Sequence, residues 1–539
     1  MYGSITLENR FGVNKMELIS LKYAIFVIVL LVLYYCFPKK YRWYVLLAGS
    51  MAYYVIICKW YVLFIIFTIC TTYGSTIWID KLLKEQNAIV KSHKEDWDRQ
   101  TRKEYKEKGR KKRVAVMLFA LLCNFGILAF LKYIPYAGEL GLLLPLGISF
   151  YTFQSMGYVM DVYREIVEPE KNFFKVALFV SFFPQIIQGP IAIYDKFAGQ
   201  LYEGHSLRLE NLQKGALLVL WGVMKKLVIA DRAVNIINFV MDKPMDFSGT
   251  YVFFAAVVYA LQLYADFSGG IDIVRGIAEM FGITMSTNFN HPYFSRSLTE
   301  YWHRWHMTLG DWCRNYIFYP LSISKRFLNF GKWLKPRFGA HISKVLPGCI
   351  ASVITFIVIG VWHGANMKYL YFGLWNGIVI MLAELFAPVN KKVAGGFFKL
   401  TGLREKGIFA TIVSVFWTFM LILVGYYFDI AANASTAFHM LFKSVTDFHI
   451  SELGINNIIL NLGACGLDEY DILLLIICTL LWFFISFVEE NKKLDMRDFI
   501  LSRKLPLRWA IIYLGIFIVI IFGYYGPGVN PADFVYMQF

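Results

Sequence analysis

Apolar runs that are long enough to cross a bilayer recur along almost the whole chain, and they constrain its fold more than any other feature. Of the 539 residues, 58% are hydrophobic and only 17% are charged. Because the hydrocarbon core offers no water to backbone groups, apolar runs of about 20 residues cross it as helices. A soluble chain of this length divides instead into domains with polar surfaces between them. The sequence therefore predicts an all-α polytopic membrane protein.

We expect about 11 to 13 transmembrane or re-entrant helices. The predicted segments share an apolar composition and cover residues 21–37, 44–58, 61–79, 114–131, 142–159, 173–193, 216–229, 251–267, 345–361, 369–386, 408–428, 472–487 and 509–525. Two of them, 142–159 and 173–193, contain glycine, proline and amide side chains. Such residues indicate broken or re-entrant helices that line a cavity enclosed by protein. No internal repeat or soluble domain is visible, so residues 1–539 are expected to form a single membrane-embedded domain.

Positive charge is concentrated between the apolar runs. The formal net charge is +16, and residues 81–113 alone carry 13 basic and 6 acidic side chains. Lysine and arginine accumulate in cytoplasmic loops, so the excess reflects membrane topology rather than nucleic-acid binding. We therefore predict a cytoplasmic basic loop over residues 80–113, helical from 91, and an extracytoplasmic N-terminus in the cell membrane.

Two histidine-containing blocks interrupt this apolar pattern. The stretch Glu300–Tyr316 holds two histidines, two arginines, two carboxylates and three tryptophans, and Val361–Asn366 holds another histidine. Ionisable groups at membrane depth are costly and are usually retained for function. The spacing of His303 and His306 places both on one face of a helix. We expect an interfacial or re-entrant segment within residues 288–346, and we expect the rest of the chain to bring the two blocks together.

The histidines suit acid–base chemistry. A neutral imidazole, with a pKa of about 6.5, can take the proton of a hydroxyl that attacks a thioester. The chain has no G-x-S-x-G elbow and no P-loop, so a serine hydrolase or a nucleotide hydrolase lacks its motif. His306 and His363 are the candidates for one base and one orienting group. The alternative for each is a buried, hydrogen-bonded histidine of the core.

A metal site is the competing chemistry for the same stretch. Glu300, His303 and His306 form the Glu-x-x-His element of carboxylate di-iron proteins. A membrane di-iron enzyme needs more histidine clusters than this chain holds, and its eight scattered cysteines show no zinc or disulfide spacing. We therefore predict no metal site.

A second basic stretch follows the histidine block. Residues 325–344 carry six lysines and arginines and no acidic residue, which predicts a cytoplasmic basic loop. This loop is a candidate docking surface for an anionic donor, and a purely topological role is the alternative. A helix that starts at Lys344 would rise about 28 Å by His363, toward the outer leaflet.

Several blocks, in this order, resemble the membrane-bound O-acyltransferase family, and more narrowly the bacterial branch that contains alginate O-acetyltransferase and the D-alanyl transfer protein of teichoic acid. The blocks lie within a family core of about residues 140–380, apart from one at the C-terminal end. They are Leu144–Gln154, Phe182–Pro190, Tyr264–Gly269, Asn288–Tyr293, Tyr301–Pro320, Val361–Gly364 and Phe534–Phe539.

The resemblance implies a helical bundle around a central tunnel. It matches His363 to the family's essential histidine and His306 to its second histidine, and it assigns no role to His303. Substrate or donor contacts are expected at Trp305, Asp311, Arg314, Asn315, Asn366 and Gln188. The residues after Leu321 and the run Gly425–Phe428 depart from the alginate-type pattern, so the resemblance points to the chemistry and leaves the polymer open.

By this resemblance, the protein moves an acyl group, most simply acetyl, from a cytoplasmic thioester to a hydroxyl of an extracytoplasmic polysaccharide. The donor is acetyl coenzyme A or an acyl carrier protein, and no cofactor stays bound. Expected partners are the bilayer, a polysaccharide or teichoic acid and an extracytoplasmic acyltransferase. D-alanyl transfer to teichoic acid and lipid acylation are alternatives. A transporter or channel is the alternative of another class, which broken helices also fit.

Overall fold

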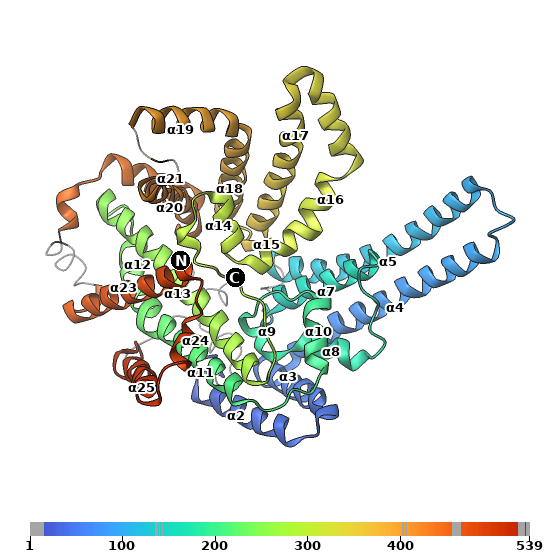
Figure 1. The fold of residues 1–539 in the computed structure, drawn as a ribbon, viewed down its shortest axis with the longest axis horizontal. Coiled ribbons are helices and arrows are strands. Elements are labelled where there is room, and N and C mark those ends of the chain that lie inside the picture. Colours follow the sequence, from blue (N-terminus) through green and yellow to red (C-terminus); the bar gives the residue numbers. More distant parts are fainter. Residues whose placement is uncertain are drawn as a thin grey trace. The chain divides into compact units, whose positions relative to one another are not determined.

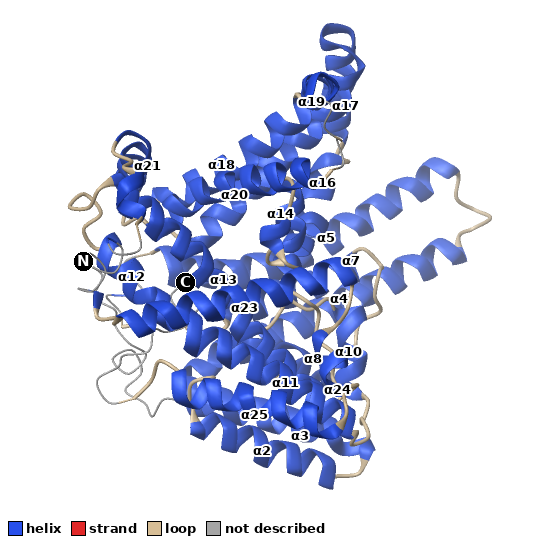
Figure 2. Cartoon of the chain, turned by 60° about the vertical axis from the view of Figure 1, so that its left-hand side comes forward, coloured by secondary structure: helices blue, strands red, loops and turns tan. Residues whose placement is uncertain are grey.

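The computed structural model describes residues 16–134, 138, 141–142, 144–401, 404, 407–454, 457, 465–526 and 534. Every regular element within these residues is a helix (Figure 2). In the part of the chain that the structure describes, seven helices are long and apolar enough to cross a membrane, or eight if the bent pair Met367–Leu385 and Ala387–Gly396 is one span. The predicted all-α, multi-pass membrane fold is confirmed.

The predicted spans correspond to helices, although fewer of them reach full spanning length. Leu21–Cys36 and Phe173–Gln188 are apolar but short, and the continuous stretch Lys39–Ser92 includes two predicted spans. The described chain divides into two compact units, residues 1–219 with 273–286 and residues 220–272 with 287–539. The single domain and the central tunnel remain predictions.

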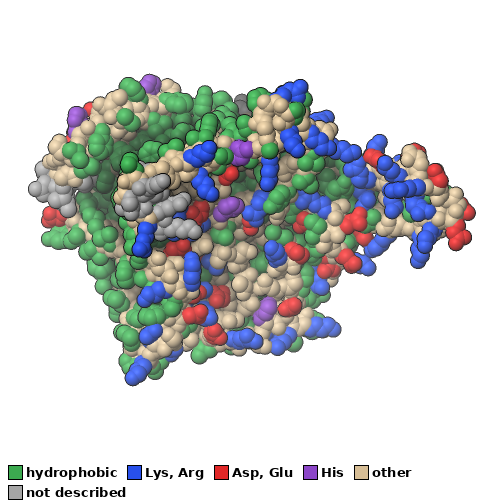
Figure 3. Space-filling model, turned by 45° about the horizontal axis from the view of Figure 1, so that its top comes forward, with side chains coloured by type: hydrophobic (Ala, Val, Ile, Leu, Met, Phe, Trp, Pro, Cys, Tyr) green, Lys and Arg blue, Asp and Glu red, His purple; other side chains and the backbone are tan. Residues whose placement is uncertain are grey.

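The first unit contains the N-terminal helices (Figure 1). They are α2 (Leu21–Cys36), α3 (Arg42–Cys58), α4 (Val62–Ser92), α5 (Arg99–Tyr133), α7 (Ile148–Tyr163), α8 (Phe173–Ser181), α9 (Phe183–Gln188), α10 (Tyr194–Tyr202) and part of α11 (Leu209–Met224), with short 3₁₀ turns at Lys39–Tyr41 and Lys59–Tyr61. Helices α4 and α5 form a long hairpin whose tip carries mixed basic and acidic side chains (Figure 3). The predicted basic segment 80–113 is therefore mostly helical, and Asp98 caps the start of α5.

The predicted break within residues 173–193 is confirmed. Helix α8 ends at Ser181 and α9 begins at Phe183, because the intervening Phe182 has extended backbone torsions. The Ser50 hydroxyl accepts the amide N–H of Phe183 at 3.1 Å. The Gln154 side chain donates to the carbonyl of Phe179 at 2.6 Å. Side chains of neighbouring helices thus satisfy the backbone groups that the break releases.

The second unit contains the remaining helices. They are part of α11 and of α13 (Gly249–Met280), and all of α12 (Asp231–Met241), α14 (Leu298–Arg304), α15 (Met307–Cys313), α16 (Tyr319–Ser322), α17 (Lys325–His363), α18 (Met367–Leu385), α19 (Ala387–Thr401), α20 (Ile408–Ile430), α21 (Ala434–Thr446), α23 (Glu469–Lys492), α24 (Met496–Leu501) and α25 (Leu505–Phe522). Two π-helical turns, Lys225–Ala230 and Arg314–Phe318, and 3₁₀ turns at Pro292–Phe294 and Ile450–Leu453 complete it.

The predicted basic loop at residues 325–344 is wrong, because this stretch is the first part of α17. Ser324 accepts the N–H of Phe327 and caps the helix. Lysine, arginine and leucine, which make up eight of these 20 residues, are good helix formers. Gly339, with φ of 81°, breaks α17 into two parts. The second part continues without a further break to His363, as the sequence predicted.

Helices α17 and α18 approach closely at glycines. A Cβ atom on Gly360 would lie 2.3 Å from the carbonyl oxygen of Tyr369, and one on Gly373 would lie 2.3 Å from that of Phe356. Small residues let two membrane helices pack backbone against backbone. This packing fixes the end of α17, where His363 lies, against the first turns of α18.

A buried charge cluster holds the second unit together around the π-helical turn. The Lys226 ammonium pairs with Asp231 at 2.8 Å and with Asp266 at 2.6 Å. The Lys225 ammonium pairs with Asp272 at 2.7 Å. Asp266 and Asp272 thus bind lysines inside the protein.

We predict that Lys226→Met destabilises the protein by about 3–5 kcal/mol, because it leaves Asp231 and Asp266 buried without their cation. The measurement is the thermal unfolding midpoint of the full chain in detergent. Arg110→Ala is the control, because the Arg110–Glu107 pair leaves 58% and 50% of the two side chains exposed. Such surface pairs contribute at most about 1 kcal/mol. Equal shifts in the two variants would contradict the prediction.

Candidate active site

A cavity of about 40 Å³ within the second unit brings the two predicted histidines together. Its polar lining consists of His306, His363, Asn376 and Asp429. Six aromatic side chains supply most of the remaining wall, namely Phe267, Tyr301, Trp302, Trp305, Phe372 and Tyr426. These residues come from α13, α14, α15, α17, α18, α20 and the break between α14 and α15.

His306 lies at a break in the helical path. Its backbone is left-handed, with φ of 43° and ψ of 51°, between the end of α14 and the start of α15. The preceding loop supports this conformation, because the carbonyl of Asn288 accepts the N–H of Met307 at 2.9 Å and the N–H of Asn290 donates to the carbonyl of Arg304 at 3.0 Å. Histidine is among the residues that adopt the left-handed region more readily than most.

This break corrects the prediction that His303 and His306 share a helix face. Tertiary hydrogen bonds to the loop replace the continuing helical ones, so the two side chains diverge. His303 is exposed, whereas only 4% of the His306 surface is accessible. The local spacing alone could not show that α14 stops at Arg304.

Hydrogen bonds to Asn288 determine which ring nitrogen of His306 carries the proton. Oδ1 of Asn288 accepts the backbone N–H of Thr308 at 3.1 Å and its hydroxyl at 2.9 Å. Because a backbone N–H can only donate, the atom at this position is the amide oxygen. His306 Nδ1, 3.2 Å from the same oxygen, therefore donates to it. Nε2 is then the ring nitrogen that can accept a hydrogen bond or a proton.

Burial keeps His306 neutral. Desolvation, with a smaller contribution from the imidazole of His363, lowers the pKa of His306 to about 3. The Phe267 ring packs edge-on against it at a centroid distance of 4.9 Å. A group with so low a pKa is a poor proton acceptor near neutral pH. His306 therefore suits the role of a hydrogen-bond acceptor that orients a substrate.

His363 has a different environment at the end of α17. It is half-buried. The centre of its ring lies 6.0 Å from the ring centre of Tyr369 and 5.5 Å from that of Phe372. The Tyr369 ring leaves no room for a Cβ atom on the next residue, Gly364. His363 is the last residue of α17, so its ring lies beside the C-terminal carbonyl groups of that helix.

Sequence analysis missed several polar residues of this cavity. Trp302 donates to Oδ1 of Asn376 at 3.0 Å, and the hydroxyls of Tyr301 and Tyr426 are 2.7 Å apart. Asn376 lies within the predicted span 369–386, and Asp429 directly follows the predicted span 408–428, which was the available signal. Their convergence on one cavity depends on the packing of α18 and α20.

The other predicted contact residues are distributed differently. Trp305 lines the cavity, while Asp311 and Arg314 form a partly exposed ion pair at 2.5 Å outside the described lining. Asn366 caps α18 by accepting the N–H of Lys368 at 3.1 Å. Gln188 belongs to the first unit and is fully buried. Asn315 is half-buried. The roles of these residues remain predictions.

The side chains that the metal-binding alternative requires do not come together. Glu300 pairs with Arg304 at 2.7 Å rather than approaching the histidines. Among the described residues, no three histidine, cysteine, aspartate or glutamate side chains are grouped so that they could hold a metal ion.

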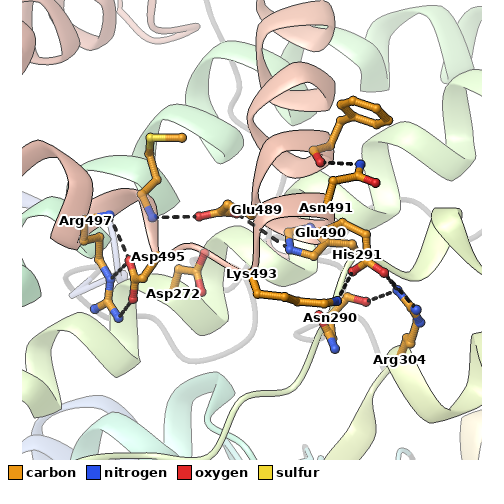
Figure 4. Close-up of polar contacts among 12 residues, drawn as sticks. Asp272, Asn290, His291, Arg304, Glu489, Glu490, Asn491, Lys493, Asp495 and Arg497 are labelled. Atoms are coloured by element: carbon orange, nitrogen blue, oxygen red, sulfur yellow. Dashed lines mark hydrogen bonds and ion pairs between the residues drawn. The ribbon is translucent and has the colours of Figure 1, made fainter.

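A polar cluster anchors the loop that carries Asn288 to the end of α23 (Figure 4). Arg304 pairs with Glu490 at 3.0 Å, and His291 lies 3.7 Å from Glu489. Burial lowers the pKa of His291. Arg304 thus ties the loop, through Asn290, to both α14 and α23.

Comparison with known proteins gives a consistent picture. Residues 169–335 match the model of the membrane-bound O-acyltransferase family. The chain is similar to a probable alginate O-acetylase of Pseudomonas syringae pv. tomato, with 30% identity over 58% of this chain and 54% of the relative. It is also similar to the peptidoglycan O-acetyltransferase of Helicobacter pylori, with 29% identity over 51% and 56% of the two chains. The teichoic acid D-alanyltransferase of Bacillus subtilis is 26% identical over 52% and 67%.

The matches thus extend over little more than half the length of the two O-acetylating relatives.

We predict that the stability of the protein falls by about 2 kcal/mol between pH 7 and pH 5 through His306 alone. An unfolded histidine, with a pKa of about 6.5, binds a proton in this range, whereas the buried His306 does not. Stability is therefore lost as the pH decreases. Unfolding midpoints of wild type and His306→Gln at the two pH values measure the difference.

The exposed His303 provides the control for this measurement. His303→Gln should keep the pH dependence of the wild type, and His306→Gln should weaken it. An unchanged pH dependence in His306→Gln would contradict the burial of a neutral imidazole.

Proposed function

Because the chain belongs to the membrane-bound O-acyltransferase family, we propose that it transfers an acyl group, most simply acetyl, from a thioester to a hydroxyl of an extracytoplasmic or secreted polysaccharide. The observation that carries the proposal is the cavity in which His306 and His363 meet. Two relatives with similar sequences are named for O-acetylation of alginate and of peptidoglycan.

The two histidines have separate roles in the proposed reaction. His363 takes the proton of the acceptor hydroxyl while the hydroxyl oxygen attacks the thioester carbonyl carbon. The new C–O ester bond forms, the C–S bond breaks, and the thiolate leaves and regains a proton. His306 stays neutral and orients the acceptor through Nε2. No covalent enzyme intermediate is required.

The size of the cavity supports a small acyl group. Each water-sized occupant needs at least about 10–15 Å³ of such volume, so 40 Å³ holds about three of them. An acetyl group has three non-hydrogen atoms. The cavity therefore suits a small acyl group such as acetyl better than a long lipid chain.

Helix α17 supports a direction for the transfer. Its six basic residues lie between Lys325 and Lys344, on two arms that meet at Gly339 and pack together where Gly331 approaches Ser343 (Figure 1). His363 ends the second arm, about 28 Å from Lys344 along the helix. With the basic end in the cytoplasm, the donor thioester arrives from the cytoplasm and His363 lies toward the outside. Acetyl coenzyme A is the proposed donor, and the basic end of α17 is the proposed docking surface.

A second candidate function is D-alanyl transfer to teichoic acid. The carboxyl group of Asp429 in the cavity wall favours it, because a D-alanyl group carries an ammonium. Release of the ester-linked groups with mild base, followed by separation of acetate from D-alanine, distinguishes the two functions.

We predict that His363→Ala lowers the O-acyl content of cell-envelope and secreted polysaccharide at least about 100-fold, as expected for loss of a general base. His306→Ala should lower it about tenfold or more, because the acceptor loses its orienting group. Each variant complements a strain in which the gene is deleted, and protein levels in the membrane are compared.

His303→Ala is the matched control, since His303 lies on the adjacent helix but is exposed. It should keep the ester content of the wild type. Ester retained with His363→Ala would exclude His363 as the base. No ester difference even in the deletion strain would overturn the proposed function.

A further inference from the structure

Asp429 is a polar group of the cavity that the proposed acid–base step does not use. It is the only aspartate, glutamate, lysine or arginine among the described residues that line the cavity. It lies one residue before the end of α20 and is half-buried. An acidic side chain in an otherwise aromatic wall is costly to place there, so its position needs an explanation.

One oxygen of this carboxyl group is bound and the other is available. The hydroxyl of Tyr259, from α13, donates to Oδ2 of Asp429 at 2.7 Å. The Tyr259 ring in turn packs edge-on against Tyr426, at a centroid distance of 5.6 Å. Among the described residues, no other donor reaches the Asp429 carboxyl group. Oδ1 therefore remains as an acceptor for a ligand hydroxyl.

The nearest cation, the Lys368 ammonium, interacts electrostatically with Asp429 and also binds backbone carbonyl groups. The Lys368 ammonium donates to the backbone carbonyls of Asp429 at 2.7 Å and of Ala431 at 2.8 Å. It also lies 4.7 Å from the centre of the Tyr369 ring, and it is not part of the described cavity lining. Among the described residues that line the cavity, no lysine or arginine is present to pair with a substrate carboxylate or phosphate beside Asp429. Burial of an unpaired anion is strongly unfavourable.

Asp429 and His363 lie on the same side of the site. Asp429 is near the C-terminal end of α20 and His363 is the last residue of α17. The first turn of α18 joins these two ends, because Asn366 donates to the carbonyl of Ala432 at 3.3 Å and Lys368 binds Asp429. In the proposed function this is the side from which the acceptor approaches.

We propose that Asp429 selects the acceptor, and that this acceptor is a sugar without a carboxylate or phosphate near the hydroxyl that is esterified. The inference rests on the proposed function. A reacting hydroxyl has one proton, which goes to His363. Asp429 Oδ1 therefore accepts a hydrogen bond from a second hydroxyl of the same sugar, and Tyr259 positions the carboxyl group. His306 Nε2 accepts from a further hydroxyl, so the acceptor class is an uncharged sugar with at least three free hydroxyls.

The test uses membranes that contain the full chain, acetyl coenzyme A, and two oligosaccharides of equal length, a neutral glucan and a uronate polymer. Ester formation on each is measured for wild type, Asp429→Asn and Asp429→Arg. We expect wild type to esterify the neutral oligosaccharide at least about tenfold better. Asp429→Asn should lower that rate about 10- to 100-fold, as for the loss of a hydrogen bond to a charged group.

Further variants separate binding from folding. Asp429→Arg should shift the preference toward the uronate, which a merely structural role does not predict. Tyr259→Phe should raise the KM for the neutral sugar, because it only positions Asp429. Asp242→Asn is the matched control, since Asp242 is exposed in the same unit, and it should leave both rates unchanged.

The outcomes are distinct. A wild-type preference for the uronate, or equal rates for wild type and Asp429→Asn, would overturn this inference. The proposed function would still stand in that case if ester formation depends on His363. D-alanine as the transferred group, lost in Asp429→Asn, would assign Asp429 to the donor and overturn the inference. No His363-dependent ester on either sugar would overturn both proposals.

Discussion

The amide of Asn288 is the interaction on which the candidate site depends most. Its single oxygen accepts hydrogen bonds from both the backbone and the hydroxyl of Thr308 and from the His306 ring. In surroundings with little water, each of these polar groups needs a partner within the protein. The same asparagine holds the left-handed break through its carbonyl. One residue thus fixes where the helix stops, where His306 points and which nitrogen carries its proton.

Burial then gives the two histidines different chemistry. His306 is enclosed and has a lowered pKa, whereas His363 is half-buried at the end of α17. Groups whose environments differ in this way divide the roles of acid–base chemistry between them. The small volume between them limits what can react there. The proposed base and the proposed orienting group therefore belong to one cavity.

Much of the fold followed from local pattern. Apolar runs predicted the helices, and glycine, proline and amides predicted the break at Phe182. The basic stretch after Leu321 was wrongly assigned to a loop. Positive charge predicts a cytoplasmic position, but it does not predict whether the backbone is helical. The prediction of a continuous helix across Trp305 and His306 was also wrong, but for the opposite reason. There the local spacing suited a helix, and hydrogen bonds to a distant loop replaced it.

The sequence alone determined the class of the protein, its helices and the two histidine blocks, because apolar length and rare polar residues in apolar surroundings are local properties. Only the tertiary structure decided that His306 and His363 share a cavity, that His303 is excluded from it, and that Asn288, Asn376 and Asp429 belong beside them. Those facts depend on contacts between residues far apart in the chain. Which side chains converge is set by how α13, α17, α18 and α20 pack, and no local pattern encodes that packing.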